Sequence, residues 1–486
     1  MPAPKSFKLI WVVVAVFVTF FLISRVYTGE DQPYSLGKVE LTQPTTETQL
    51  EPQHQIVQDA HQLQSADAFL PHFKAVLQLP GYTVQEAKRT CPLKHGEKVN
   101  FQWHEDSPGK TWISQDTPKA EIEFRRREWQ SFIDSGMIPY SEVRKKFAGR
   151  GLVVVAGNQD TLKRVEVILR SLVRLRSSIA IELHYWDDEM SEQDRKRLLN
   201  IYPTISFNDL SGTHNILHIK KDGAYINYQL KTAALVNSRF AEPILIDSDN
   251  VPVIDPTLLY ETKTYREFGT VFWPDIARTR PQNPAWAIFN TPCRLDEYEQ
   301  ESGQLLVDKT RFWYHLQLAS WLNNEQGAYY NEFLLGDKDM FRFAWHALKT
   351  QYGQPKRWLT SVGTVNDGFY CGHSFAQYHP DDDRIMFMHG GLVKTVDLEV
   401  MKWNREIGGY FRNYKRALSD KDPTVSVDVA IKFDGAAYKP DHGPEFHAAM
   451  CTDMFDVEPR SLDEILPGFE KTFEELGGYW MLDEVS

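Results

Sequence analysis

The chain is poor in several features that define common classes of protein. Its four cysteines lie far apart, with no Cys-x-x-Cys spacing, which argues against a zinc site. It contains neither Gly-x-Gly-x-x-Gly nor Gly-x-x-x-x-Gly-Lys, so the usual dinucleotide fingerprint and the P-loop are both missing. The net charge of -12 and the lack of a basic stripe argue against a nucleic-acid partner.

What is present is the composition of a large globular enzyme. At 486 residues, of which 42% are hydrophobic and 13% aromatic, the chain can bury an extensive core. In an oxidising compartment the cysteines, which are Cys91, Cys293, Cys371 and Cys451, can form two disulfides, and three pairings are open. Four buried thiols are the alternative.

An apolar run near the N-terminus predicts attachment to a membrane. The run from Leu9 to Ile23 is flanked by Lys8 and Arg25, whose long side chains can extend their charges to the membrane surface. No clear small-x-small cleavage site follows, so an uncleaved signal anchor is favoured over a cleaved signal peptide. We expect a cytosolic tail over residues 1–8, a transmembrane anchor over 9–24, a polar stalk over 25–66 and a lumenal remainder.

Two regions follow the predicted stalk. Residues 67–150 show helical spacing from Asp67 to Leu79 and a charged helix from Ala120 to Ser135. We expect this region to be a lumenal extension that packs on the catalytic domain. Residues 151–486 are predicted to form that domain, because the pattern changes at Gly151 to short apolar strands that alternate with helices.

The alternating segments predict a doubly wound α/β sheet. Strands are expected at Leu152–Ala156, Ile181–Trp186 and Pro243–Ile246, with a helix capped by Asp160 or Thr161 after the first of them. Ligands of such sheets bind beyond the C-terminal ends of the strands. Gly157 and Asn158, which follow the first strand, are therefore candidates to contact a nucleotide base or ribose, and a plain turn is the alternative.

Two carboxylates follow the third of these strands. If the extended geometry continues past Ile246, Asp247 and Asp249 point the same way, because alternate residues of a strand share a face. Two convergent carboxylates repel each other unless a cation or a proton lies between them. A divalent cation that also binds phosphate oxygens is the simplest occupant. A polar turn is the alternative.

A second stretch with chemical character runs from Ile385 to Lys394. An apolar strand delivers the imidazole of His389, two glycines can point backbone N–H groups at an anion, and a lysine follows. The glycines are Gly390 and Gly391. An imidazole with two carboxylates and phosphate oxygens suits Mn²⁺. Asp337, at the predicted start of another helix, is either a helix cap or an active-site carboxylate.

These segments together resemble the fungal Golgi α-mannosyltransferases, the family with α-1,2- and α-1,3-mannosyltransferases of mannan and glycoprotein glycans. The matching motifs are Gln229-Leu-Lys231, Ile246-Asp-Ser-Asp-Asn-Val-Pro252, Val271-Phe-Trp-Pro-Asp275, Glu301-Ser-Gly-Gln304, Val307-Asp-Lys309 and Gly336-Asp-Lys-Asp339. Their order is also similar to that of the glycogenin-like retaining transferases. The resemblance implies a GT-A-like, nucleotide-sugar-binding α/β domain and retention of the α configuration.

The resemblance also implies roles for individual residues. Asp247, Asp249 and His389 are expected to bind Mn²⁺ and the diphosphate of GDP-mannose, with Lys231, Lys394 and the amides of Gly390 and Gly391 near the donor. Asp337, Glu301 and Gln304 are the expected catalytic residues near the donor sugar or the acceptor. The implied partners are a mannosylated glycan acceptor and other Golgi mannosyltransferases, at the Golgi membrane, in protein glycosylation and cell-wall mannan synthesis.

Two other functions fit parts of the sequence. Ile244–Val251 also fits the Asp-x-Asp-x-Val nucleophile strand of haloacid-dehalogenase-type phosphatases, but that strand normally opens its domain, and here at least two strands precede it. A non-catalytic Golgi homologue that binds glycans or assembles partner enzymes is the second alternative. Such a protein has no need of the acidic pair, His389 or Lys394.

Overall fold

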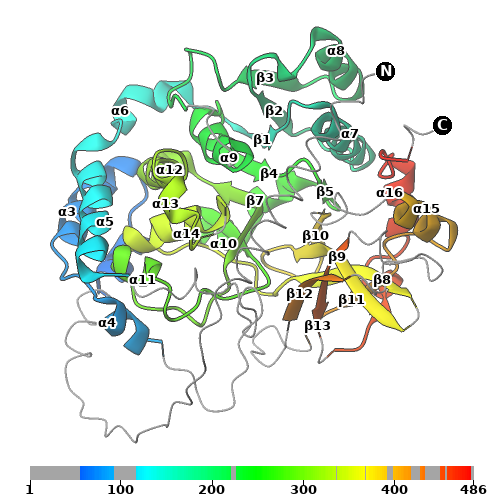
Figure 1. Ribbon diagram of the computed structural model, residues 1–486. Coiled ribbons are helices and arrows are strands. Elements are labelled where there is room, and N and C mark those ends of the chain that lie inside the picture. The colour runs from blue at the N-terminus through cyan, green and yellow to red at the C-terminus, as the bar shows by residue number, and fades with distance from the viewer. Residues whose placement is uncertain are drawn as a thin grey trace, which may run out of the picture.

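The computed structural model describes residues 55–91, 117–219, 226–334, 336–366, 368–390, 398–417, 427–432, 449–454 and 457–482 (Figure 1). The predicted anchor at 9–24 and most of the predicted stalk lie outside these ranges. Among the described residues, no helix has the length and apolar character needed to cross a membrane.

A six-stranded sheet forms the centre of the molecule. Its order is β3-β2-β1-β4-β7-β6, with β1 (Arg150–Val155), β2 (Ala180–Tyr185), β3 (Ile205–Asp209), β4 (Glu242–Ile246), β6 (Thr270–Pro274) and β7 (Gln300–Val307). The first four strands are parallel, whereas β7 runs antiparallel to both β4 and β6. The predicted α/β sheet is therefore confirmed as a mixed sheet.

Helices cover both faces of this sheet. Alternate residues of β1 enter opposite cores: Val153 packs in the core with α9 (Ile226–Asn237) and α12 (Lys309–Asn324), whereas Leu152 and Val154 pack with α7 (Gln159–Arg174). This alternation follows from the two-residue period of a strand. The sequence of β1 is a continuous apolar run because both faces of the strand are buried.

A second sheet lies beside the first, at the lower right of Figure 1. It contains β8 (Thr360–Asn366), β9 (Phe369–Tyr378), β11 (Asn413–Lys415), β12 (Val427–Lys432), β13 (Ala449–Met454) and β14 (Arg460–Ser461), in the order β12-β13-β9-β8-β11-β14. β10 (Ile385–His389) pairs with β9 and also with β5 (Asn250–Pro252). Since β5 directly follows the acidic pair, the two sheets meet at the candidate site.

The region before β1 packs on the sheet-covering helices, as predicted. It contains η1 (Ala66–Ala68), α3 (Phe69–Leu77), α4 (Val84–Arg89), α5 (Lys119–Ser131), η3 (Phe132–Gly136), α6 (Tyr140–Val143) and η4 (Arg144–Lys146). The ring of Phe69 lies 5.8 Å from that of Phe312 on α12, and Trp129 Nε1 donates to the backbone oxygen of Ile288 at 2.8 Å. The extension therefore shares one hydrophobic core with the central sheet.

The remaining described elements are η5 (Asp187–Glu189), α8 (Glu192–Ile201), η6 (Pro256–Glu261), α10 (Lys263–Phe268), α11 (Ala285–Ile288), α13 (Gly327–Tyr330), α14 (Lys338–Ala347), α15 (Leu398–Glu406), η9 (Leu462–Glu464) and α16 (Phe469–Glu475). All four cysteines form disulfides. Cys91 pairs with Cys293, and Cys371 pairs with Cys451. The first bond ties the N-terminal extension to the α/β core, and the second ties β9 to β13.

Candidate active site

The acidic pair lies on a turn at the end of β4. The Asp247 N–H donates to the Gly303 carbonyl at 2.9 Å, and the Asn250 N–H donates back to the Asp247 carbonyl at 3.1 Å before β5 begins. The predicted extended geometry across Asp247 and Asp249 is therefore wrong, because the chain reverses there. The two side chains still converge, because the turn folds Asp249 back beside Asp247.

Strand pairing brings His389 to this turn. β10 runs antiparallel to β5, with His389 opposite Asn250. His389 Nε2 lies 3.3 Å from Asp249 Oδ1 and 3.8 Å from Asp247 Oδ2. The Gly390 N–H donates to the Asp249 carbonyl at 3.0 Å. The prediction that this amide points at an anion is therefore wrong: it holds the acidic turn against β10.

The three side chains form a donor set that fits a divalent cation. One ligand atom from each of Asp247, Asp249 and His389 can be chosen so that all three lie within 4.8 Å of one another. Within the described residues both ring nitrogens of His389, Nδ1 and Nε2, are buried and neither makes a well-formed hydrogen bond. Two carboxylates and an imidazole suit Mn²⁺. Burial disfavours the charged ring, but Glu301 and Asp249 outweigh it and raise the pKa of His389 well above its usual value.

Lys231 lies on the other side of the acidic pair. Its Nζ, delivered by α9, is 3.1 Å from Asp247 Oδ1 and 3.2 Å from Asp337 Oδ2, and it donates to Ser302 Oγ at 3.0 Å. Burial disfavours the ammonium, but the carboxylates of Asp247 and Asp337 outweigh burial and raise the pKa of Lys231. Lys231 therefore stays charged and holds two carboxylates in one place.

Asp337 occupies the N-cap position of α14, but its side chain pairs with Lys231 and does not cap the helix. It makes no capping hydrogen bond to the described first turn of the helix, and its carboxylate points to Lys231. The residue is 2% exposed. Burial raises the pKa of Asp337, and the nearby Lys231 only partly offsets this. Asp337 therefore does not cap the described first turn of α14, and its active-site role stays a prediction.

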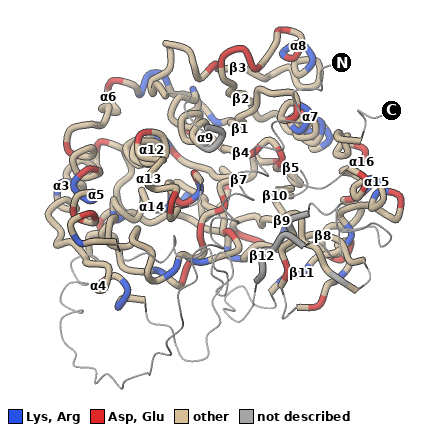
Figure 2. The backbone as a smooth tube through the Cα atoms, in the orientation of Figure 1, with Lys and Arg blue, Asp and Glu red and all other residues tan. Residues whose placement is uncertain are grey.

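Glu301 and Gln304 lie on β7, next to the acidic turn. Glu301 Oε2 is 3.2 Å from His389 Nδ1, and Gln304 Nε2 donates to the same oxygen at 2.9 Å. Asn250, which the sequence motif contained but for which no role was predicted, donates to Gln304 Oε1 at 2.6 Å. Residues from β4, β5, β7 and β10 therefore form one buried polar cluster, and Figure 2 shows acidic segments where these strands meet.

The other predicted contacts have mixed outcomes. Gly157 and Asn158 follow β1, at the same sheet edge as the acidic turn. Asn158 Oδ1 accepts from the Thr161 N–H at 3.0 Å and caps α7, so the predicted caps Asp160 and Thr161 are wrong. Gly391 and Lys394 lie outside the described residues, and their predicted contacts to the diphosphate stay predictions.

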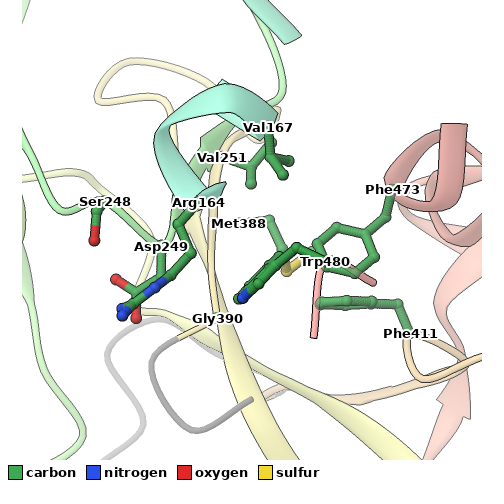
Figure 3. Close-up of a pocket in the computed structure, with 10 residues that line it drawn as sticks. All are labelled: Arg164, Val167, Ser248, Asp249, Val251, Met388, Gly390, Phe411, Phe473 and Trp480. Atoms are coloured by element: carbon green, nitrogen blue, oxygen red, sulfur yellow. The ribbon is translucent and has the colours of Figure 1, made fainter. Parts of the chain in front are cut away.

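A small hollow adjoins the outer side of Asp249 (Figure 3). The Arg164 side chain from α7 points toward the Asp249 carboxylate there, with Ser248 and Gly390 nearby. The rest of the wall is apolar and consists of Val167, Val251, Met388, Phe411, Phe473 and Trp480. Apolar surroundings lower the local dielectric and so strengthen the attraction between a carboxylate and a cation.

A buried ionic network that the sequence motifs did not reveal supports α14. Lys338 Nζ lies 2.5 Å from Asp275 Oδ2 and 2.8 Å from Glu299 Oε2, and Arg342 Nε lies 2.8 Å from Asp339 Oδ1. The two Lys338 contacts join the first turn of α14 to residues that flank β6 and β7, and the Arg342–Asp339 pair lies within the helix. Lys338 and Asp339 follow Asp337 directly, so the network also fixes where the Asp337 carboxylate lies.

Comparison with known proteins identifies relatives of this region. Residues 149–293 and 290–379 match the family model described as "Mannosyltransferase putative". Alpha-1,2-mannosyltransferase MNN22 of Candida albicans is 24% identical over 350 residues, which are 60% of this chain and 56% of that protein. MNN23 of the same organism is 27% identical over 212 residues, 34% of this chain and 35% of that protein. The matched parts thus span about a third to a little over half of these relatives.

Solved structures give a weaker similarity. A galactosyltransferase LgtC complexed with donor and acceptor sugar analogs is 17% identical, with a TM-score of 0.30 over 43% of this chain and 74% of that chain. The WbbM bifunctional glycosyltransferase is 12% identical, with a TM-score of 0.31 over 42% of this chain and 38% of that chain. Scores this low carry no argument about the site. Residues 149–379, just under half of the chain, are therefore similar to the mannosyltransferase family model, and the relatives named above are mannosyltransferases.

Proposed function

We propose that this protein transfers mannose from GDP-mannose to a mannosyl hydroxyl, with retention and with an α-1,2 or α-1,3 linkage. The observation that carries the proposal is the convergence of Asp247, Asp249 and His389 on one point, in a chain whose residues 149–379 match the mannosyltransferase family model. The proposed fold is GT-A-like. The order of the acidic turn, the Gly303 strand, the Asp337 helix and the His389 strand supports retention, as in glycogenin-like transferases.

The proposed donor site uses the residues that surround the acidic turn. Asp247, Asp249 and His389 would hold Mn²⁺, which when bound would stabilise negative charge on the departing diphosphate. Lys231 positions Asp247 and Asp337 through its two ion pairs. Asp337 is the buried carboxylate available to stabilise an oxocarbenium-like sugar or to attack it.

We further propose that the protein acts in the Golgi lumen as a single-pass type II membrane protein, attached through residues 9–24. The apolar run at Leu9–Ile23 supports the anchor. The disulfides Cys91–Cys293 and Cys371–Cys451 support a lumenal location, because disulfides persist in oxidising compartments. Mannosylated N-glycans, O-glycans and cell-wall mannan are the proposed acceptors, and assembly with other Golgi mannosyltransferases is part of this proposal.

The direct test is a transfer assay on the full-length chain in detergent. Radiolabelled GDP-mannose, Mn²⁺ and a panel of α-mannosides should yield a labelled product, and linkage analysis should identify the new bond. UDP-glucose and UDP-galactose serve as donor controls. Release of phosphate from p-nitrophenyl phosphate without transfer would favour the phosphatase alternative, and neither transfer nor GDP release would favour the non-catalytic one. Three strands of the sheet, β1, β2 and β3, precede the acidic turn, which already disfavours the phosphatase.

A further inference from the structure

We infer that Glu301 is a positioning residue that fixes the ring of His389 so that Nε2 faces Asp247 and Asp249. This inference rests on the proposed metal site. The two ring nitrogens of His389 have different neighbours: Nδ1 lies 3.2 Å from Glu301 Oε2, and Nε2 lies 3.3 Å from Asp249 Oδ1. When a cation binds at Asp247 and Asp249 it would take the Nε2 lone pair, and the Glu301 carboxylate would keep the remaining ring proton on Nδ1.

Glu301 is itself held in place by its own strand. The Gly303 N–H donates to Glu301 Oε1 at 2.7 Å, and Gln304 Nε2 donates to Glu301 Oε2 at 2.9 Å. Both carboxylate oxygens therefore have partners, and the side chain of Glu301 is only 11% exposed. A carboxylate with this arrangement is suited to orient a neighbouring ring rather than to bind a mobile sugar hydroxyl.

The contacts around Glu301 form a closed circuit of side chains that begins and ends at the strand pair β5–β10. Asn250 Nδ2 donates to Gln304 Oε1 and to the Gly303 carbonyl, each at 2.6 Å. Asn250 is in turn the residue opposite His389 in the pairing of β5 with β10. The chain of contacts from His389 through Glu301 and Gln304 to Asn250 thus returns to the strand pair that delivers the imidazole. Glu301 and Gln304 act together as a support for the ring.

Gly303 completes this support by leaving room for the ring. A Cβ at this position would lie 2.5 Å from both Cε1 and Nδ1 of His389 and 2.8 Å from Glu301 Oε2. The imidazole therefore packs directly on the backbone of β7. In the Glu-Ser-Gly-Gln motif at 301–304, Glu301 faces the imidazole of His389, Gly303 leaves room for it, and Gln304 holds the Glu301 carboxylate.

The test measures Mn²⁺ affinity of the full-length chain in detergent, from the EPR signal of free Mn²⁺. Glu301→Gln should weaken Mn²⁺ binding about ten- to hundredfold, as loss of an outer-shell partner does elsewhere. Gln304→Met, which removes the support of Glu301 and keeps its charge, should weaken it less. Glu242→Gln, at the far end of β4, is the matched control and should leave Mn²⁺ affinity unchanged. Near-UV circular dichroism verifies that each variant is folded.

Kinetics separate the positioning role from a sugar contact. If Glu301 positions His389, raised Mn²⁺ should restore part of the lost transfer in Glu301→Gln, and the KM for the acceptor should stay unchanged. A folded Glu301→Gln with wild-type Mn²⁺ affinity, or with only a raised acceptor KM, overturns the inference and leaves the proposed function standing. A wild-type chain that binds no Mn²⁺ overturns the metal site as well as the inference.

Discussion

Substitution of Gly303 by alanine tests the geometry of the site without removing any of its charged groups. The new Cβ would lie 2.5 Å from two atoms of the His389 ring. Ordinary carbon contacts are about 3.5 Å, so the ring must move by about 1 Å. The backbone of β7 cannot shift to relieve this clash, because it pairs with β4 on one side and with β6 on the other.

The expected result follows from that displacement. A misplacement of about 1 Å in a catalytic site can cost about a hundredfold in rate, so Gly303→Ala should lower kcat by about that factor. Overpacking should cost about 1–3 kcal/mol of stability. Transfer from GDP-mannose measures the first effect, and urea unfolding measures the second.

A matched control is available at Gly327 on α13. A Cβ there would meet Asn331 Nδ2 at 3.4 Å, which is an ordinary contact. Gly327→Ala should therefore have nearly wild-type activity. A Gly303→Ala variant with wild-type kcat and Mn²⁺ affinity would refute the close packing of His389 on β7.

Three further predictions follow from buried groups. Lys231→Met leaves Asp247 and Asp337 facing each other without the lysine ammonium, so it should lower the free energy of unfolding by about 3–5 kcal/mol. Urea unfolding should show this loss and its partial recovery with Mn²⁺. A loss below about 1 kcal/mol would contradict the role of Lys231. Replacement of both Cys371 and Cys451 by serine should lower the free energy of unfolding by about 2–5 kcal/mol in the same assay; reductant is the control and should lower the wild type at least as far, because it also breaks Cys91–Cys293. Burial lowers the pKa of His373 to about 3, so its neutral ring stabilises the fold above pH 6.5 and this stability is lost as the pH falls. From pH 7 to pH 5 the loss should be about 2 kcal/mol, and His373→Gln should lack it; an unchanged pH slope in the variant would contradict the assignment.

The sequence predicted the buried strands best. The expected strand Pro243–Ile246 is β4, and Ile385–His389 is β10, because apolar runs bounded by turn residues leave few alternatives. The resemblance to mannosyltransferases was also predicted from the sequence, because the motifs occur together in one order, and residues 149–379 match that family model.

The details that could not be predicted depend on pairing between distant segments. No local pattern indicates that β5 pairs with β10, although this pairing places His389 beside Asp249. The same holds for the choice among three disulfide pairings. Asp337 has the local signal of a helix cap, but Lys231, far away in the sequence, attracts its carboxylate instead. Trp273, in the motif Val271–Asp275, is fully buried, and its Nε1 donates to the Tyr378 carbonyl at 2.8 Å.

The most direct test of the account is calorimetric titration of GDP into the full-length chain, with and without Mn²⁺, for the wild type and for Asp249→Asn. We predict that Mn²⁺ strengthens GDP binding by the wild type and has little effect on the folded variant, because the cation needs both carboxylates and His389. Equal GDP affinity of the wild type with and without Mn²⁺, or a full Mn²⁺ effect in Asp249→Asn, would contradict the proposed metal-dependent donor site.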